Sequence, residues 1–340
     1  MSNLLQKPII NWGIIGLGKI STQFVNDLLL VSDASLYAVG SRSQEKANAF
    51  AQEFNVAKAY GAYDDLFNDS DVDIIYIGTP HDSHAELSIR AMEYGKHVLC
   101  EKPIAINRVQ TEQMIRVSRN ENKFLMEAFW SRFNPTIIEV FKRIKEEVIG
   151  EVKYLNTEFA FNAEGMTNPR LTELSLGGGS LLDVGIYPLF LAYSILGIPD
   201  EILATSNAFD SGADKQTSVI FQYENAQAIL HSSFASDANN ISTISGTDGR
   251  IIINSRWHEA RSYTLVSNDQ SETFQFEVGG KGYVHEIDEC HRCIQQGKIE
   301  SDLWSHEDSL NLIGLADKVR KQIGLVYPCL LYTSPSPRDA

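Results

Sequence analysis

The sequence is poor in cysteine, has no excess of basic residues and contains no long uninterrupted apolar run. Its four cysteines are too few for a disulfide framework. Cys290 and Cys293 form one Cys-x-x-Cys within a predicted helix, and no second pair completes a zinc site. We therefore expect reduced helix cysteines, no metal site and a cytoplasmic location.

Two further absences concern membranes. No run of about 18 apolar residues is present, which argues against a membrane-spanning helix. The first residues lack the apolar core of a signal peptide. We expect no membrane association.

The charge balance is acidic, with a formal net charge of −15. Such a chain repels polyanions, so nucleic acids and acidic membrane surfaces are excluded as expected partners. An anionic cofactor is still compatible with this charge, because a helix N-terminus and one or two local cations suffice to hold it. With 340 residues, 43% of them hydrophobic, the chain is long enough for two domains with sizeable cores.

Short apolar runs alternate with helical patterns over the first part of the chain. This alternation predicts an α/β domain at residues 1–128, a Rossmann domain with a parallel, doubly wound sheet. The predicted strands are 9–15, 36–39, 74–77, 97–100 and 124–126, and the predicted helices are 19–30, 45–54, 83–94 and 108–120.

The pattern changes after Trp130. Alternating apolar and polar residues predict an α+β domain at 129–328, built on a large, mainly antiparallel sheet. We expect this domain to bind substrate and to mediate dimerisation. Its predicted strands are 152–161, 202–208, 218–223, 227–233, 241–245, 250–253, 263–266 and 273–278, and its predicted helices are 135–148, 283–296 and 307–323. Residues 329–340 resemble translated sequencing-adapter read-through, so we interpret them as a non-native tail; a natural disordered tail is the alternative.

A glycine motif, Gly13-x-x-Gly16-x-Gly18, stands where the first predicted strand meets the first helix. Glycine permits a tight turn and the close approach of a pyrophosphate, whose charge then faces the helix N-terminus. Ser21 replaces the usual third glycine and is still small enough for close helix–strand packing. The motif, with Lys19 and Ile20 at the start of the helix, predicts a dinucleotide site.

The end of the second predicted strand bears on cofactor choice. NAD-specific sites usually place Asp or Glu there, whereas this chain has Ser41, Arg42 and Ser43. Arg42 can pair with a 2′-phosphate, the serines can donate hydrogen bonds, and Lys46 adds charge. We therefore favour NADP over NAD, the alternative being that Arg42 is only a solvated loop cation.

Thr79-Pro80-His81 follows the next central strand, at the carboxyl edge where ligands bind in such sheets. We expect Thr79 to lie along the cofactor. His81 is a candidate contact to substrate or nicotinamide, and a structural hydrogen-bonding role is the alternative. We interpret His84 as the first residue of a helix.

The candidate catalytic residues are Lys102, Asp183 and Tyr187. Asp183 and Tyr187 are four residues apart, so on an α-helix they share one face. Oxidation of an alcohol needs a proton acceptor, and a phenol becomes one when a nearby ammonium, here Lys102, favours its ionised form. Asp183 would orient the substrate or the tyrosine. The alternative is a capped aspartate and a core tyrosine. Pro188 predicts a kink near 184–185.

The motifs together resemble those of the Gfo/Idh/MocA oxidoreductases. They are the glycine motif, Glu101-Lys102-Pro103 and Gly177-Gly-Gly-Ser-Leu-Leu-Asp183-x-Gly185-x-Tyr187. Segment 125–135 resembles the branch that contains dimeric dihydrodiol dehydrogenase and NADP-dependent D-xylose dehydrogenase. Most of the family carries His where this chain has Tyr187, a departure typical of that branch. The resemblance covers 11–328 and implies a cis Lys102–Pro103 bond, with Glu101 and Lys102 beside the cofactor.

These observations predict an NADP-dependent dehydrogenase acting on a sugar, such as an aldose at its anomeric carbon, or on a cyclic trans-diol. One alternative is a regulator of the same fold that senses the dinucleotide without turnover; another is a tight-cofactor enzyme that shuttles hydride between two sugars. An exposed apolar sheet face predicts a homodimer. The candidates for the substrate pocket, with core packing as their alternative, are Trp130, Arg132, Phe133 and Phe161.

Overall fold

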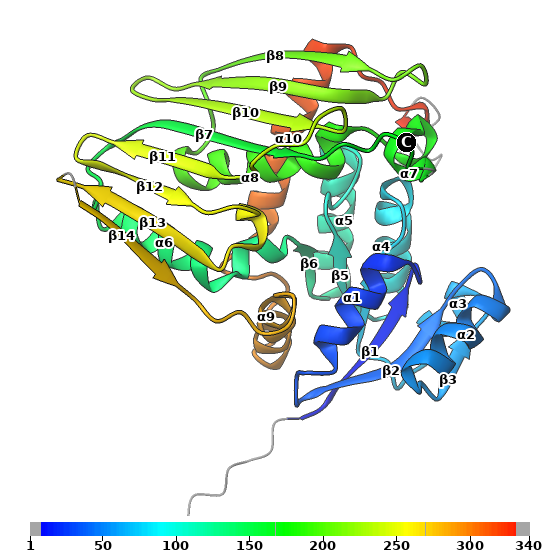
Figure 1. The fold of residues 1–340 in the computed structure, drawn as a ribbon. Coiled ribbons are helices and arrows are strands. Elements are labelled where there is room, and N and C mark those ends of the chain that lie inside the picture. Colours follow the sequence, from blue (N-terminus) through cyan, green and yellow to red (C-terminus); the bar gives the residue numbers. More distant parts are fainter. Residues whose placement is uncertain (1–7, 167, 269, 331–340) are drawn as a thin grey trace, which may run out of the picture. The chain divides into compact units, whose positions relative to one another are not determined.

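The computed structural model describes residues 8–166, 168–268 and 270–330, which divide into two compact units (Figure 1). Unit one contains residues up to 104, 109–133 and 278–309, and unit two contains 105–108, 134–277 and the residues from 310 onward. The division expected from the sequence had placed 278–309 in the second domain. Of the tail expected at 329–340, residues 331–340 lie outside the described residues.

The return of 278–309 to unit one has a clear cause. The helix in this segment, α9 (Val284–Gln295), contacts α1 (Lys19–Leu28). Asp27 of α1 accepts hydrogen bonds from the backbone N–H groups of Gly282 and Tyr283, at 2.9 and 2.8 Å. A carboxylate at a helix N-terminus is stabilising, so Asp27 holds α9 to unit one.

Unit one is built on a six-stranded parallel sheet of order β3-β2-β1-β4-β5-β6 (Figure 1), which confirms the predicted Rossmann sheet. The central strands are buried on both faces, as in a doubly wound sheet. The short β3 was not predicted, because three residues carry no readable alternation. The strands are β1 Ile10–Ile15, β2 Ala34–Gly40, β3 Lys58–Tyr60, β4 Ile74–Ile77, β5 His97–Glu101 and β6 Leu125–Ala128.

Helices connect these strands and bury one apolar face each. Phe24 of α1, for example, stacks on Tyr76 of β4 with ring centroids 3.8 Å apart. Ser43 caps the second helix by accepting a hydrogen bond from the backbone N–H of Lys46. The remaining helices are α2 Gln44–Phe54, α3 Tyr63–Phe67, α4 His84–Glu93 and α5 Arg108–Glu121, with 3₁₀ turns η1 His81–Ser83 and η2 Trp130–Phe133.

Unit two is built on an eight-stranded sheet of order β14-β13-β12-β11-β7-β10-β9-β8. Among the described strands of this sheet only β7 and β10 pair in parallel, which confirms the mainly antiparallel prediction. The last strand begins and ends earlier than predicted, because Ser267 pairs with Gln270 in a tight hairpin. The strands are β7 Val152–Ala160, β8 Glu201–Ala208, β9 Asp214–Gln222, β10 Gln227–Ser233, β11 Ser242–Gly246, β12 Gly249–Ile253, β13 Ser262–Ser267 and β14 Gln270–Gln275.

One helical segment of unit two packs against the middle of this sheet, where α8 (Ile186–Leu196) contacts β7 and β10. Contrary to our sequence analysis, the stretch Leu174–Leu196 is apolar and long enough to cross a membrane, but 78% of its most apolar window is buried within the protein. Such burial is that of a core helix. The other helical elements are α6 Pro135–Lys145, α7 Pro169–Thr172, α10 His306–Ile323, a π-helical stretch at Leu181–Gly185, and 3₁₀ turns η3 Leu174–Leu176, η5 Trp257–Glu259 and η6 Pro328–Leu330.

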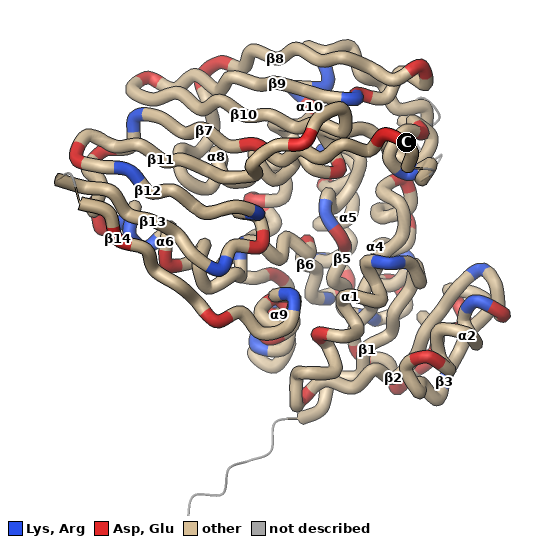
Figure 2. Tube along the Cα trace, viewed as in Figure 1, with Lys and Arg blue, Asp and Glu red and all other residues tan. Residues whose placement is uncertain are grey.

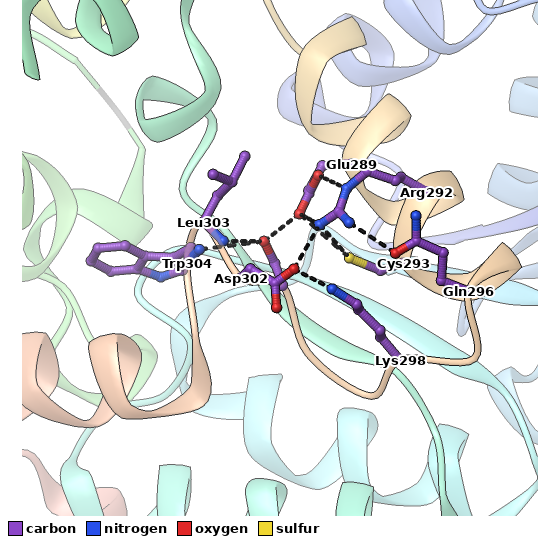
Figure 3. Close-up of polar contacts among 9 residues, drawn as sticks. Glu289, Arg292, Cys293, Gln296, Lys298, Asp302, Leu303 and Trp304 are labelled. Atoms are coloured by element: carbon purple, nitrogen blue, oxygen red, sulfur yellow. Dashed lines mark hydrogen bonds and ion pairs between the residues drawn. The ribbon is translucent and has the colours of Figure 1, made fainter. Parts of the chain in front are cut away.

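The cysteines of α9 are free and buried, as predicted. The Sγ of Cys293 lies 3.4 Å from Oε1 of Glu289, which also accepts hydrogen bonds from Arg292 and Ser301 (Figure 3). Burial raises the pKa of Cys293 to about 12, so the thiol stays protonated and unreactive at neutral pH.

Candidate active site

The turn between β1 and α1 is shaped to receive a pyrophosphate. Gly16 adopts φ +79°, and a Cβ there would lie 2.4 Å from the carbonyl carbon of Gly78. Gly18 is the N-cap of α1; no side chain caps this helix, and its first turn, beginning with Lys19 and Ile20, carries no acid. The first backbone N–H groups of α1 are therefore available for an anion, which is what a dinucleotide requires.

Two other small residues of this turn act through packing. Ser21 donates a hydrogen bond from Oγ to the carbonyl of Gly16 at 2.9 Å, and a Cβ on Gly78 would lie 2.5 Å from that Oγ. Gly13 lies inside β1, where a Cβ would approach Cδ1 of Ile75 to 2.8 Å. Gly13 thus permits close packing within unit one, a role that our sequence analysis did not assign to it.

Arg42 lies in the turn after β2, which ends at Gly40 without an acidic residue. Two residues not predicted from the sequence surround it. Burial raises the pKa of Tyr63, and a hydrogen bond and the charge of Arg42 partly oppose the effect. Burial also raises the pKa of Asp82, again opposed in part by Arg42. Ser41 accepts a hydrogen bond from the backbone N–H of Ser43 at 3.2 Å. This exposed guanidinium fits a 2′-phosphate.

Thr79 and His81 follow β4 as predicted. Both are buried, and Oγ1 of Thr79 accepts a hydrogen bond from the Ser83 hydroxyl at 2.9 Å. The ring of His81 packs edge-on against that of His84, with centroids 5.7 Å apart. His84 begins α4, which confirms its interpretation as a helix N-terminal residue.

Glu101 and Lys102 stand at the carboxyl end of β5, and the Lys102–Pro103 bond is cis, as the family resemblance implied. Glu101 accepts two hydrogen bonds, from the Tyr76 hydroxyl at 2.7 Å and from the backbone N–H of Lys102 at 3.2 Å. Burial and the Glu101 charge raise the pKa of Tyr76 well above its usual range. Tyr76 therefore remains a neutral donor that fixes the Glu101 carboxylate.

Asp183 of unit two is held by a residue that sequence analysis missed. Arg170 donates two hydrogen bonds to its carboxylate, from Nη1 to Oδ1 at 2.6 Å and from Nη2 to Oδ2 at 3.3 Å. A bidentate guanidinium keeps a carboxylate ionised and fixes its orientation. Thirteen residues separate the partners, and no periodic pattern links positions so far apart.

The backbone around Asp183 is a π-helical stretch instead of the kinked α-helix that Pro188 predicted. A proline lacks the N–H for the preceding turn, and a wider turn is one way to accommodate that loss. Because Asp183 lies in this stretch and Tyr187 in α8, the simple α-helical spacing assumed between them does not hold.

Asp214 anchors the start of that stretch. Its Oδ2 accepts hydrogen bonds from the Ser180 hydroxyl and the backbone N–H of Leu181, both at 2.7 Å, and from the Thr217 hydroxyl at 2.9 Å. Gly179 must be glycine here, since its φ is +126° and a Cβ would lie 2.1 Å from Oδ1 of Asp214. These contacts fix the backbone that carries Asp183.

Tyr187 is 5% exposed and is surrounded by aromatic rings of its own unit. Ring centroids of Phe159, His258 and Trp257 lie 5.4, 5.5 and 6.5 Å from that of Tyr187. Phe159 and His258 stack at 4.0 Å. The ring of Tyr187 is thus packed among aromatic rings, and Asp183, held by Arg170 of α7, lies in the helical stretch directly before α8.

The predicted substrate residues are divided between the units. Trp130, Arg132 and Phe133 belong to η2 of unit one, where Trp130 stacks on Tyr283 at 4.9 Å and burial lowers the pKa of Arg132. Phe161 follows β7 in unit two, and its ring lies 5.1 Å from that of Phe234. Their contact with substrate stays a prediction.

Comparison with known proteins agrees with this geometry. Residues 10–129 match a family described as an oxidoreductase family with an NAD-binding Rossmann fold, and residues 137–252 match the GFO/IDH/MocA C-terminal domain. The chain therefore belongs to the Gfo/Idh/MocA oxidoreductases and is an NAD(P)-dependent oxidoreductase, as its motifs predicted.

Individual relatives resemble it over nearly their whole length. A trans-1,2-dihydrobenzene-1,2-diol dehydrogenase from Xenopus tropicalis is 36% identical over 330 residues, covering 93% of this chain and 99% of the relative. The scyllo-inositol 2-dehydrogenase (NADP(+)) IolU of Bacillus subtilis is 32% identical over 328 residues, covering 94% and 99%. The structure of KijD10, a 3-ketoreductase from Actinomadura kijaniata in complex with NADP and TDP-benzene, matches with a TM-score of 0.84 at 27% identity, covering 93% and 98%.

Proposed function

We propose that this protein is an NADP-dependent dehydrogenase that oxidises a cyclic trans-diol or a sugar, such as D-xylose at its anomeric carbon. The observation that carries the proposal is the aromatic enclosure around Tyr187 in α8, together with the Asp183 carboxylate that Arg170 holds in the π-helical stretch directly before α8. Aromatic faces suit the apolar face of a six-membered ring, and a carboxylate suits its hydroxyl groups. Relatives named for a cyclohexadiene diol and for an inositol, both cyclic vicinal diols, support the same class.

NADP, when bound, would supply the hydride acceptor for the substrate carbon. Gly16, Gly18 and the N-terminus of α1 would hold its pyrophosphate, and Arg42 would hold its 2′-phosphate. Tyr187 takes the hydroxyl proton as the hydride leaves, and Lys102 favours the phenolate that does so. Asp183 accepts a hydrogen bond from the substrate and orients it. Oxidation of a diol then yields a hydroxyketone, and oxidation of an aldose yields a lactone.

The experiment is a screen of purified protein for NADPH formation. We expect absorbance at 340 nm to rise with trans-dihydrodiols, inositols or aldoses, D-xylose included. Tight NADP binding without NADPH formation across this panel would instead favour the regulatory protein of the same fold. NADPH formation with at least one of these substrates would support the dehydrogenase assignment.

Arg42 is expected to determine the choice of cofactor. Arg42→Ala should raise the Michaelis constant for NADP about ten- to hundredfold and change that for NAD little, since one charge-assisted pair is worth about 1.5–3 kcal/mol. Steady-state kinetics with both cofactors test this. Arg116→Ala, an exposed arginine on α5, is the control. Equal effects on both cofactors would rule out a 2′-phosphate contact.

We also propose that the exposed face of the unit-two sheet binds a second copy of this chain. Leu203, Ile220 and Ile229 are exposed and lie side by side in one row across β8, β9 and β10. The charged residues of these strands stand only at the strand starts, and the rest of each strand is uncharged (Figure 2). An apolar row of this kind is a liability in a monomer and a contact in a symmetric dimer.

Ile220→Asp should convert the dimer to a monomer, because it places a charge in the middle of the row. Sedimentation velocity at micromolar concentration measures this. Ile198→Asp makes the same change at an exposed loop position after α8 and should leave the dimer intact. A wild-type monomer would overturn the proposed interface.

A further inference from the structure

His84 connects two of the segments that carry predicted cofactor contacts of unit one, the loop after β4 and the end of β5. Its ring is fully buried. Nε2 lies 2.9 Å from the carbonyl oxygen of Thr79, and Nδ1 lies 2.9 Å from the carbonyl oxygen of Pro103. Thr79 begins the loop after β4, and Pro103 follows Glu101 and Lys102 at the end of β5. The His84 side chain thus links the segments that follow β4 and β5, two neighbouring strands of the parallel sheet.

The chemistry of the two partners fixes the state of the ring. A backbone carbonyl oxygen only accepts hydrogen bonds, so each ring nitrogen has to donate. A neutral imidazole carries one N–H and would turn a lone pair toward the other oxygen at 2.9 Å. Two donations require an imidazolium. An unmet buried acceptor is costly, so the protonated ring is the one that satisfies both loops.

We propose that His84 is a positioning residue of the cofactor site, acting as a doubly donating imidazolium that fixes the Thr79 loop relative to the Glu101–Lys102 segment. It acts through Thr79 and Lys102, whose separation sets the width of the site at the carboxyl edge of the sheet. The inference rests on the dinucleotide site but not on the identity of the substrate.

Other ionisable groups lie near the ring, and none of them is changed by substitution of His84. They are present in both the wild type and a His84 variant, so the difference between the two proteins reports on His84 and on its electrostatic coupling to these groups. These groups are His81 and Asp82 in η1, Glu86 on α4, and Glu101 and Lys102 beside Pro103.

His97 provides a matched control, because its contribution to stability should change with pH in the opposite direction to that of His84. It is a half-buried histidine of the same unit, but its Nδ1 accepts a hydrogen bond from the backbone N–H of Phe124 at 2.9 Å. Burial lowers the pKa of His97 to about 4, so it is neutral in the folded protein. Its stabilising contribution is present above its unfolded value and lost as the pH falls. A ring that keeps its proton on folding, as proposed for His84, contributes stability at low pH and loses that contribution as the pH rises.

The test compares the wild type with His84→Gln and His97→Gln between pH 6 and pH 9. The melting-temperature advantage of the wild type over His84→Gln should shrink as the pH rises, and that over His97→Gln should not. His84→Gln should weaken NADP binding, measured by fluorescence titration, about tenfold, whereas His97→Gln should leave it unchanged. Should His84→Gln fail to fold, ¹⁵N NMR of the wild type at pH 7.5 measures the protonation state of the ring. We then expect one histidine ring that carries two N–H protons.

Two results would overturn the proposal. One is evidence that the ring is neutral, either a ring with a single N–H or a melting-temperature advantage of the wild type over His84→Gln that does not change with pH. The other is unchanged NADP affinity in folded His84→Gln, which would make the residue purely structural. Failure of the wild type to bind NADP would count against the proposed cofactor instead, and the pH comparison would still decide the state of the ring.

Discussion

Tyr187→Phe is expected to lower turnover by about 10²–10⁴-fold, the usual contribution of a positioned general acid or base. The substitution keeps the ring and its packing against Phe159, His258 and Trp257 but removes the oxygen that we propose accepts the proton. NADP affinity should be nearly unchanged, because the loss falls on the transition state. Steady-state kinetics and cofactor titration together separate the two effects.

Lys102→Met extends the same argument to the cation. Without the ammonium, the phenolate of Tyr187 is disfavoured, so the residual rate should rise only at higher pH than in the wild type. The pH–rate profile of the two proteins is the measurement. A profile that keeps its shape would exclude Lys102 from that role.

A matched control lies on the same helix. Tyr193→Phe removes a hydroxyl that accepts a hydrogen bond from the Asn311 side chain at 3.2 Å and that has no part in the proposed chemistry. It should retain near-wild-type turnover. If Tyr187→Phe also retained most of the rate, the base would lie elsewhere, with Asp183 and His81 the next candidates.

The fold was predictable because its signals are local. Alternating βα patterns identify a parallel sheet, and period-two alternation identifies the strands of unit two. The return of 278–309 to unit one could not be predicted from the sequence. Asp27 and Tyr283 at the start of α9 are 256 residues apart, and only the folded chain brings them together. The short β3 and the hairpin of β14 were missed or shifted because brief elements carry little pattern.

Two local features of the candidate site could be predicted from the sequence. The tight turn at Gly16 and Gly18 follows from the glycine motif, and the cis bond before Pro103 was implied by the family resemblance. The hydrogen-bond partners of Asp183 and Glu101 could not be predicted from the sequence. Arg170 binds Asp183, Asp214 fixes the helical stretch that carries Asp183, and Tyr76 binds Glu101. Each partner is distant in the sequence and belongs to no motif.

One buried acid in unit one is expected to cost stability. Glu286 of α9 is fully buried, and neither of its carboxyl oxygens has a hydrogen-bond partner within the described residues. Burial raises the pKa of Glu286 well above its usual value, and the charges of Glu101 and Asp27 raise it further. The folded protein therefore keeps this carboxyl protonated, whereas the unfolded chain ionises it.

The linkage sets the sign of the effect. A group whose folded pKa is raised contributes stability below its unfolded pKa and loses it as the pH rises, here by about 1.4 kcal/mol per pH unit until the folded pKa is reached. Glu289 on the same helix differs. Burial acts to raise its pKa, but hydrogen bonds from Arg292 and Ser301 outweigh burial and lower it (Figure 3). Its ionised form is stabilising above the unfolded value.

The free energy of unfolding of Glu286→Gln should therefore be near that of the wild type at pH 4 and should exceed it at pH 8, since glutamine keeps the shape and does not titrate. Glu289→Gln should show the opposite trend and lose stability as the pH rises. Urea unfolding at the two pH values measures both differences. An equal pH dependence in the wild type and Glu286→Gln would mean that the carboxyl ionises in the folded state, and a partner for it would then have to be sought in the native protein.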